Sequence, residues 1–251
     1  MATETRLILP EHVTPTNYDV KLEPNFDTFT FQGAVTIKAD VNQTTDSIVL
    51  NSAELEIQDV SVDSEGVKCD VLDVSINPDN ETISIKLAKG LEIGTSNLQV
   101  QISFIGSLND RLLGFYKSQY IDINGNEKFL AATQFESTDA RRAFPCWDEP
   151  SKKATFDVSL DIPDEMVAVS NMPIVSDVKG LAGRKTITFD TTPIMSTYLL
   201  AFIVGELGCI EQSTKSGTLM RVWTTAGKEE QGRFALQTSI DLLDYYNDYF
   251  G

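Results

Sequence analysis

Apolar and polar residues alternate with a period of two through most of this chain, and this limits the folds open to it. The pattern runs from "YDVKLEP" at 18–24 to "TYLLAFIVGEL" at 197–207, in short stretches separated by turn residues. Alternate residues of a strand point to opposite faces of a sheet, so such stretches are typical of half-buried strands. Short strands that recur about every 8 to 12 residues favour antiparallel sheets over βαβ units. We therefore expect a mainly β fold, an antiparallel saddle-like sandwich.

Further alternating runs predict the other strands of this fold. One segment, "YIDINGNEKFL" at 120–130, carries Asn124-Gly125 between two runs, and this dipeptide predicts a hairpin with a two-residue loop. The remaining runs lie at 33–41, 47–63, 69–76, 82–88, 98–106, 154–163, 166–171, 185–193 and 218–225.

The pattern changes near the end of the sequence. From Lys228 onward, apolar residues recur at spacings of four, three, three and four, namely Leu236, Ile240, Leu243, Tyr246 and Phe250. This spacing predicts an amphipathic helix over 228–250, with an aromatic-rich face that has little remaining chain to pack against. We expect a complete β-domain at 1–206 and, at 207–251, the opening of a second, incomplete domain.

Composition narrows the partners and the compartment. The net charge of −17 argues against nucleic acid and against an anionic membrane surface as partners. No stretch approaches the roughly 20 apolar residues that span a bilayer, and the first residues, 1–13, lack the apolar core of a secretory signal. Three widely spaced cysteines, Cys69, Cys146 and Cys209, indicate no disulfide framework. These features favour a cytoplasmic protein.

Histidine is the scarcest potential catalytic residue. His12 is the only one in the chain, and it lies near the N-terminus. No paired-histidine metal motif and no Ser-His or Cys-His relay can therefore be assembled. Judged by its own residues, the chain lacks a hydrolytic centre and a metal site.

The segment at 128–150, "KFLAATQFESTDARRAFPCWDEP", differs from the surrounding strands. If it begins as a strand with Phe135 in the core, then Gln134 and Glu136 emerge side by side on the other face. A carboxylate there suits a free α-amine, whose pKa of about 8 leaves it mostly protonated at neutral pH. The structural alternative is that Glu136 pairs with Arg141 or Arg142, and spacing alone leaves both open.

The rest of this segment is expected to have a structural role. The stretch 137–144 predicts a short helical turn with Ser137 or Thr138 as its N-cap, closed by a proline. We expect the following Asp148 and Glu149 to pair with Arg or Lys.

These motifs resemble those of a known enzyme family. The long block at 131–150, "AATQFESTDARRAFPCWDEP", is similar to the signature of zinc aminopeptidases of the puromycin-sensitive type, within the gluzincins, and its cytosolic fungal and animal members look most similar. In-order matches support the resemblance at 9–37, 112–120, 167–173 and 192–206. It implies the family's N-terminal saddle-like β-domain, followed by the first strand and helix of a thermolysin-like catalytic domain.

The resemblance also implies roles for residues. Glu136 matches the glutamate that holds the substrate's α-ammonium, and Gln134 matches a residue lining the pocket for the first side chain. The family's Gly-x-Met-Glu-Asn and His-Glu-x-x-His motifs, its zinc ligands and its catalytic base are absent from this sequence. The expectation is therefore the substrate-recognition portion of a cytoplasmic zinc metalloaminopeptidase of peptide catabolism. This portion alone is expected to be inactive, and its partners are peptide substrates and the catalytic domain of the same polypeptide.

A second function class is a non-catalytic binding module that keeps the aminopeptidase β-domain. The helix at 228–250 argues against it, because a self-sufficient module should not end on an uncovered aromatic face. The reading frame after Gly251 separates the two: a stop codon supports the module, and a frame running into Gly-x-Met-Glu-Asn supports the enzyme.

Overall fold

The computed structural model of the chain describes residues 8–251, so the expectation for the N-terminal segment 1–13 lies partly outside the described residues. The fold is mainly β, as expected, with one α-helix among the described residues. Compact packing divides the chain into two units. The first comprises the chain up to Lys117 with Ala131–Asp164 and Ala168–Ile203, and the second comprises Ser118–Leu130, Glu165–Val167 and Val204–Gly251. The domain boundary at 206/207 stays a prediction.

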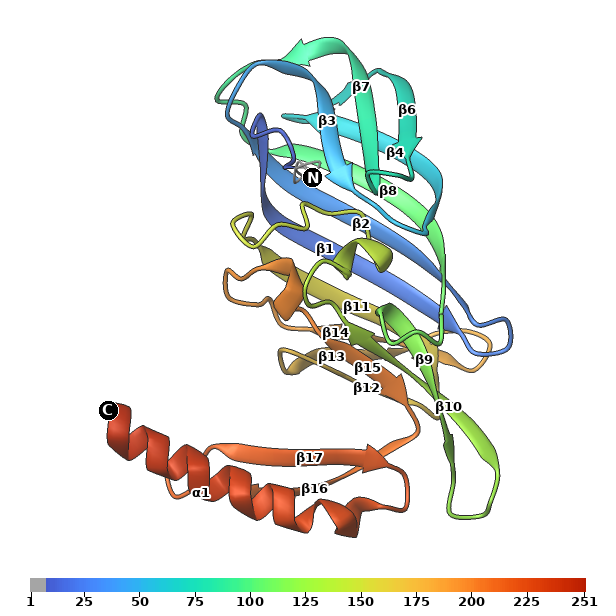
Figure 1. The fold of residues 1–251 in the computed structure, drawn as a ribbon, viewed down its shortest axis with the longest axis vertical. Helices are drawn as coiled ribbons and strands as arrows, with labels where there is room; N and C mark the ends of the chain where they lie inside the picture. Colours follow the sequence, from blue (N-terminus) through green and yellow to red (C-terminus); the bar gives the residue numbers. More distant parts are fainter. Residues whose placement is uncertain (1–7) are drawn as a thin grey trace, which may run out of the picture. The chain divides into compact units, whose positions relative to one another are not determined.

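An eight-stranded sheet forms the main body of the first unit (Figure 1). Its strands, in spatial order, are β13 (Ile174–Lys179), β14 (Arg184–Phe189), β11 (Thr155–Pro163), β1 (Val13–Asn25), β2 (Thr30–Val41), β8 (Leu98–Ser107), β4 (Glu56–Ser64) and β5 (Val67–Cys69). Most neighbours are antiparallel, but β1 and β11 run parallel, with Asn17 opposite Thr155. The alternation predicted both strands but not this pairing.

A smaller sheet in the same unit has the order β3 (Thr45–Asn51), β7 (Thr82–Leu91) and β6 (Val71–Asn77). The turn between β6 and β7 ends at Glu81, whose φ of 51° lies in the left-handed region. A further sheet has the order β12 (Val167–Ser170), β15 (Phe202–Gly205), β10 (Glu127–Gln134) and β9 (Gly114–Ile121).

Aromatic rings fill the core of the first unit. The Tyr18 and Phe156 rings stack with centroids 5.0 Å apart, and Phe144 meets Tyr18 edge-on. Phe135 contacts Phe144 and Phe202 in the same edge-on manner. These rings are fully buried, so the core reaches directly beneath the end of β10.

The second unit contains a hairpin and a helix. β16 (Leu207–Ser213) pairs with β17 (Leu219–Thr225), and α1 (Arg233–Phe250) packs along them (Figure 1). The predicted helix face is confirmed at Leu236 and Ile240, which are buried, but Tyr246 and Phe250 are exposed. Within residues 8–251, no helix is long and apolar enough to cross a bilayer.

Several local predictions were wrong, and two of them concern strand ends. The hairpin at Asn124-Gly125 forms, but its strands end at Ile121 and resume at Glu127. The five-residue loop arises because the Asp122 carboxylate accepts backbone N–H bonds from Asn124 and Asn126. Within the run 197–207, only β15 and the first residue of β16 are strand, because Thr197–Leu199 forms a 3-10 turn, η2.

Candidate functional site

Strand β10 delivers the two candidate residues to the surface. Phe135, directly after the strand, is 2% exposed and anchors the backbone in the aromatic core. Gln134 and Glu136 flank it and are both exposed, as the alternation predicts. The alternation is weaker farther back along β10: Phe129 is only half-buried, and Ala132, two residues before Gln134, is buried.

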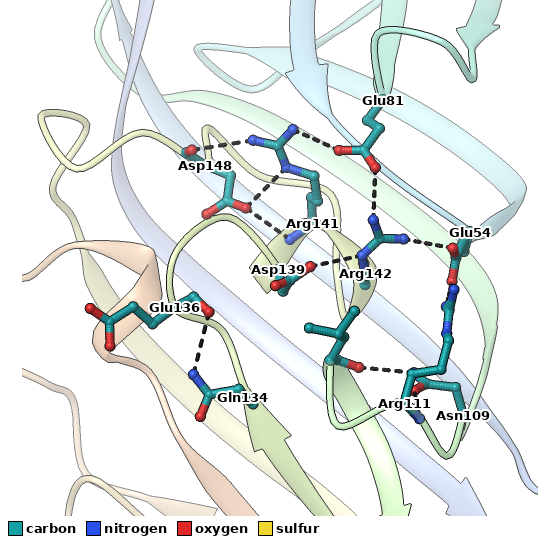
Figure 2. A network of polar contacts seen from close by, with 11 residues as sticks. Glu54, Glu81, Asn109, Arg111, Gln134, Glu136, Asp139, Arg141, Arg142 and Asp148 are labelled. Carbon is teal, nitrogen blue, oxygen red and sulfur yellow. Dashed lines mark hydrogen bonds and ion pairs between the residues drawn. The ribbon is translucent and has the colours of Figure 1, made fainter.

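The carboxylate of Glu136 has no hydrogen-bond or salt-bridge partner among the described residues. The contact between the two candidates runs through the main chain, because Gln134 Nε2 donates to the backbone oxygen of Glu136 at 3.3 Å. Figure 2 shows the Glu136 carboxylate directed away from the cluster of arginines on the same loop. The site therefore offers a solvent-facing negative charge beside an amide.

The structural alternative for Glu136 was wrong, because both arginines bind other acids. Arg141 forms ion pairs with Asp148 at 3.1 Å and with Glu81 at 3.0 Å. Arg142 forms ion pairs with Glu81 at 2.8 Å, Asp139 at 2.8 Å and Glu54 at 2.7 Å (Figure 2). Their guanidinium donors are therefore occupied by acids other than Glu136.

Glu54 closes the outer side of this network. It also pairs with Arg111, which follows Asn109 in a surface loop. Burial raises the pKa of the Glu54 carboxyl, but Arg111 and Arg142 outweigh burial and hold that pKa below its usual range. Partial burial lowers the pKa of Arg142, yet its contacts with Asp139, Glu54 and Glu81 raise it overall, so the charged state persists.

A short 3-10 turn, η1 (Ala140–Arg142), presents the two arginines. Its N-cap is Asp139 rather than the predicted Ser137 or Thr138, and no side-chain cap bond forms. The Asp139 side chain binds Arg142 instead, while its backbone N–H donates to the Phe135 oxygen at 2.9 Å. This bond closes the loop that carries Glu136.

The C-terminal part of the segment is locked into the core. Asp148 is 2% exposed. Its carboxylate accepts hydrogen bonds from the side chain and the backbone N–H of Arg141, and from Thr197 Oγ1 at 2.7 Å. Asn51 exchanges backbone bonds with Cys146 and accepts the Asp148 N–H on its side chain. The expected ion pair of Glu149 does not form; its carboxylate accepts the N–H of Leu9.

The buried groups beside Asp148 are unreactive. The backbone N–H of Trp147 donates to the Tyr18 hydroxyl at 3.1 Å. Burial, reinforced by the charge of Asp148, raises the pKa of the Cys146 thiol well above its usual range. Cys146 is therefore protonated and packed as a small apolar residue, and all three cysteines are free thiols.

Comparison with known proteins identifies the family to which this fold belongs. The family model described as the Peptidase M1 N-terminal domain matches residues 14–199. The chain belongs to this family. The resemblance inferred from the motif at 131–150 is therefore confirmed, and the end of β10 lies inside the matched M1 region.

Three relatives of this M1 N-terminal domain illustrate the match. The puromycin-sensitive aminopeptidase of Caenorhabditis elegans is 45% identical over 96% of the chain and 26% of its own length. Aminopeptidase M1-A of Oryza sativa subsp. japonica is 44% identical over 96% of the chain and 28% of its own length. Aminopeptidase 2 of Candida albicans is 40% identical over 99% of the chain and 26% of its own length. The chain thus spans about a quarter of the length of these curated relatives.

The described part of this M1 domain does not fit a zinc site. Within residues 8–251, no group of three His, Cys, Asp or Glu side chains comes together in a way that could hold a metal ion. The acids of the network in Figure 2 are engaged with arginines, which supply no metal-binding lone pair.

Sequence reasoning missed the residues that hold the site from a distance. Glu81 and Glu54 bind the arginines, yet they lie about sixty residues or more before them in the chain. The available signal was local: Glu81 ends an Asn-Pro-Asp-Asn turn, and Glu54 also has a positive φ, of 57°. Neither feature identifies a partner.

Proposed function

We propose that this chain is the N-terminal substrate-recognition portion of a zinc metalloaminopeptidase that releases N-terminal residues from peptides. In this role, the Glu136 carboxylate binds the free α-ammonium of the substrate, and Gln134 lines the pocket for the first side chain. The domain family and the names of the relatives support this role. The observation that carries it is the exposed Glu136 carboxylate, left without a partner in a segment where the neighbouring arginines are all engaged.

The chemistry follows from charge. An ammonium bound by a carboxylate forms a charge-assisted hydrogen bond of about 1.5–3 kcal/mol. An internal peptide bond presents no ammonium at this position, so it loses that contact. Glu136 thereby favours chain ends over internal sites.

The remainder of the polypeptide supplies the reaction in this proposal. Zinc, when bound there, activates water for attack on the first peptide bond. The chain described here contributes binding and orientation only. The proposal includes a cytoplasmic location and a part in peptide catabolism, which agree with the three free cysteines.

Removal of the Glu136 carboxylate tests the proposal. In the full-length enzyme, Glu136→Ala and Glu136→Gln are expected to raise KM and lower kcat/KM for an aminoacyl p-nitroanilide by about 10- to 150-fold, the kinetic equivalent of the lost contact. Glu127→Gln is the matched control, because Glu127 is also exposed and opens the same strand. Unchanged kinetics in both Glu136 variants would remove Glu136 from the substrate site.

Gln134 is tested through selectivity rather than rate. Gln134→Ala is expected to change the ranking of anilides that differ in their first side chain, because the amide borders that side chain in this proposal. The dependence on the α-amine should remain, since Glu136 is intact. A ranking identical to that of the parent enzyme would contradict the role.

A further inference from the structure

We infer that Glu81 is a positioning residue for Glu136: by binding both loop arginines, it keeps them from pairing with Glu136, which stays free for an ammonium. This inference rests on the proposed function of Glu136. It assigns a recognition role to a residue of the small β3–β7–β6 sheet, 55 positions before the residue on which it acts.

The carboxylate of Glu81 is divided between the two arginines. Its Oε2 accepts from Arg141 Nη1 at 3.0 Å, and its Oε1 accepts from Arg142 Nη2 at 2.8 Å (Figure 2). Among the described residues, Glu81 is the one acid that binds both arginines. Asp148 binds only Arg141, while Glu54 and Asp139 bind only Arg142 of the pair.

The backbone of Glu81 is fixed as firmly as its side chain. Its oxygen accepts the Ser52 N–H at 2.9 Å, and its own N–H donates to Pro78 at 3.2 Å. The next residue along from Ser52, Ala53, donates to the Arg141 oxygen at 3.0 Å. Glu81 is therefore held in place on the same short segment that holds the arginine turn.

The contact also reaches the loop that carries Glu136. Arg142 Nε binds Asp139, and the Asp139 N–H binds the Phe135 oxygen at 2.9 Å. Glu136 lies between Phe135 and Asp139, the two residues that this backbone hydrogen bond joins. A shift of Arg142 therefore moves one end of a loop that is only five residues long, Phe135–Asp139.

Charge explains why the loss of Glu81 should affect Glu136 in particular. Arg141 and Arg142 have side chains only 12% and 17% exposed, so water compensates little for an unpaired guanidinium donor. Without Glu81, each arginine loses one charge-assisted bond at the same time. Glu136 is an unpaired carboxylate in the adjoining loop Phe135–Asp139, five and six residues before them, and in this inference it becomes their partner.

A double-mutant cycle in the full-length enzyme tests this route. The variants are Glu81→Gln, which keeps the shape and removes the charge, Glu136→Gln, and the two together. The measured quantity is amine dependence: the ratio of the inhibition constants of 4-methylpentanamide and leucinamide against hydrolysis of alanyl p-nitroanilide. These inhibitors differ by the α-amine alone, so a general structural defect weakens both and leaves their ratio unchanged. Asp79→Asn is the matched control, an exposed acid in the same turn.

Glu81→Gln is expected to reduce the ratio about tenfold in the parent enzyme and less than about twofold in the Glu136→Gln background, as coupled groups behave. Equal reductions in both backgrounds, or an unchanged ratio, would overturn the inference while leaving the role of Glu136 intact. An unchanged ratio in Glu136→Gln alone would overturn the proposed function itself, and the inference with it. If Glu81→Gln does not fold, Glu81→Asp takes its place in the same cycle, because its carboxylate is one methylene farther from the two arginines that Glu81 binds.

Discussion

At the scale of single residues, Glu54 links acid sensitivity to the arginine network. Its carboxyl pKa is held below the ordinary value of about 4.3 by Arg111 and Arg142. A depressed pKa in the folded state means that the unfolded chain binds more protons as the solution is acidified. The stabilisation is therefore present above about pH 4.3 and is lost as the pH falls through the folded-state pKa.

Glu54→Gln is expected to destabilise the chain at pH 6.5 and to have a smaller effect at pH 3.5, which lies below the ordinary glutamate pKa, because the unfolded chain is then protonated at Glu54 and part of the stabilisation is lost. Urea unfolding midpoints of parent and variant at the two pH values measure the difference. Glu165→Gln, at an exposed acid, serves as the control. A destabilisation of equal size at both pH values would show that Glu54 acts through shape rather than charge.

The candidate site was predictable at this scale only where information was local. The positions of Gln134 and Glu136 follow from alternation around Phe135, and the structure confirms their exposure. Their binding roles stay proposals. The pairing of Arg141 with Asp148 agrees with the expectation, but its pairing with Glu81 was not predictable, because Glu81 reaches it through the fold rather than through spacing in the sequence.

At the scale of elements, β2 and β8 are joined by two crossed pairs of glycine and phenylalanine. Gly33 lies opposite Phe104, and Phe31 lies opposite Gly106. A Cβ at Gly33 would lie 2.2 Å from the Phe104 ring and 2.9 Å from Leu22. Each ring thus covers the backbone of a glycine on the neighbouring strand, and the absent side chain makes room for it.

Gly33→Ala is expected to lower the free energy of unfolding by about 1–3 kcal/mol, the usual cost of overpacking. Gln32→Ala, one residue earlier and exposed, should change it by less than about 0.5 kcal/mol. Denaturant titration of both variants measures the contrast. Equal stability of Gly33→Ala and the parent would show that the Phe104 ring moves aside without cost.

Helix α1 depends on two buried apolar residues for its packing on the β16–β17 hairpin. Leu236 and Ile240 are 6% and 5% exposed, whereas Leu242 is 48% exposed. Ile240→Ala should weaken the hairpin–helix unit by about 2–5 kcal/mol, because it leaves a cavity under the helix. Faster amide hydrogen exchange in β16 and β17 is the expected readout, with Leu242→Ala as control. Exchange rates that match the parent in both variants would contradict this account of the packing.

The existence of the strands was predictable, but their partners and some boundaries were not. Period-two alternation located β1 and β11, yet their parallel pairing joins residues about 140 positions apart. The strand β13 went unpredicted, since most of its residues are exposed and its pattern is correspondingly weak. Tertiary pairing decides such edges, and local propensity does not.

At the scale of the whole molecule, the proposed function assigns recognition and chemistry to separate parts of the polypeptide. Residues 8–251 present an organised carboxylate with a supporting network, but they bring no three metal-ligating side chains together. The single histidine, His12, lies at the beginning of the first strand region and cannot form a paired-histidine site within the chain. The proposed function accordingly places the hydrolytic centre in the remainder of the polypeptide.

The 251-residue chain on its own is accordingly expected to bind no zinc stoichiometrically and to hydrolyse no aminoacyl p-nitroanilide. Metal analysis by mass spectrometry after dialysis against zinc measures the first, and a chromogenic assay measures the second. The ion pairs of Arg141 predict the absence of zinc binding as well as the single histidine does. Zinc would have to displace a guanidinium ion from Glu81 or Asp148. One equivalent of tightly bound zinc together with hydrolysis of the anilide would contradict this prediction, because it would show that the chain builds a catalytic centre of its own.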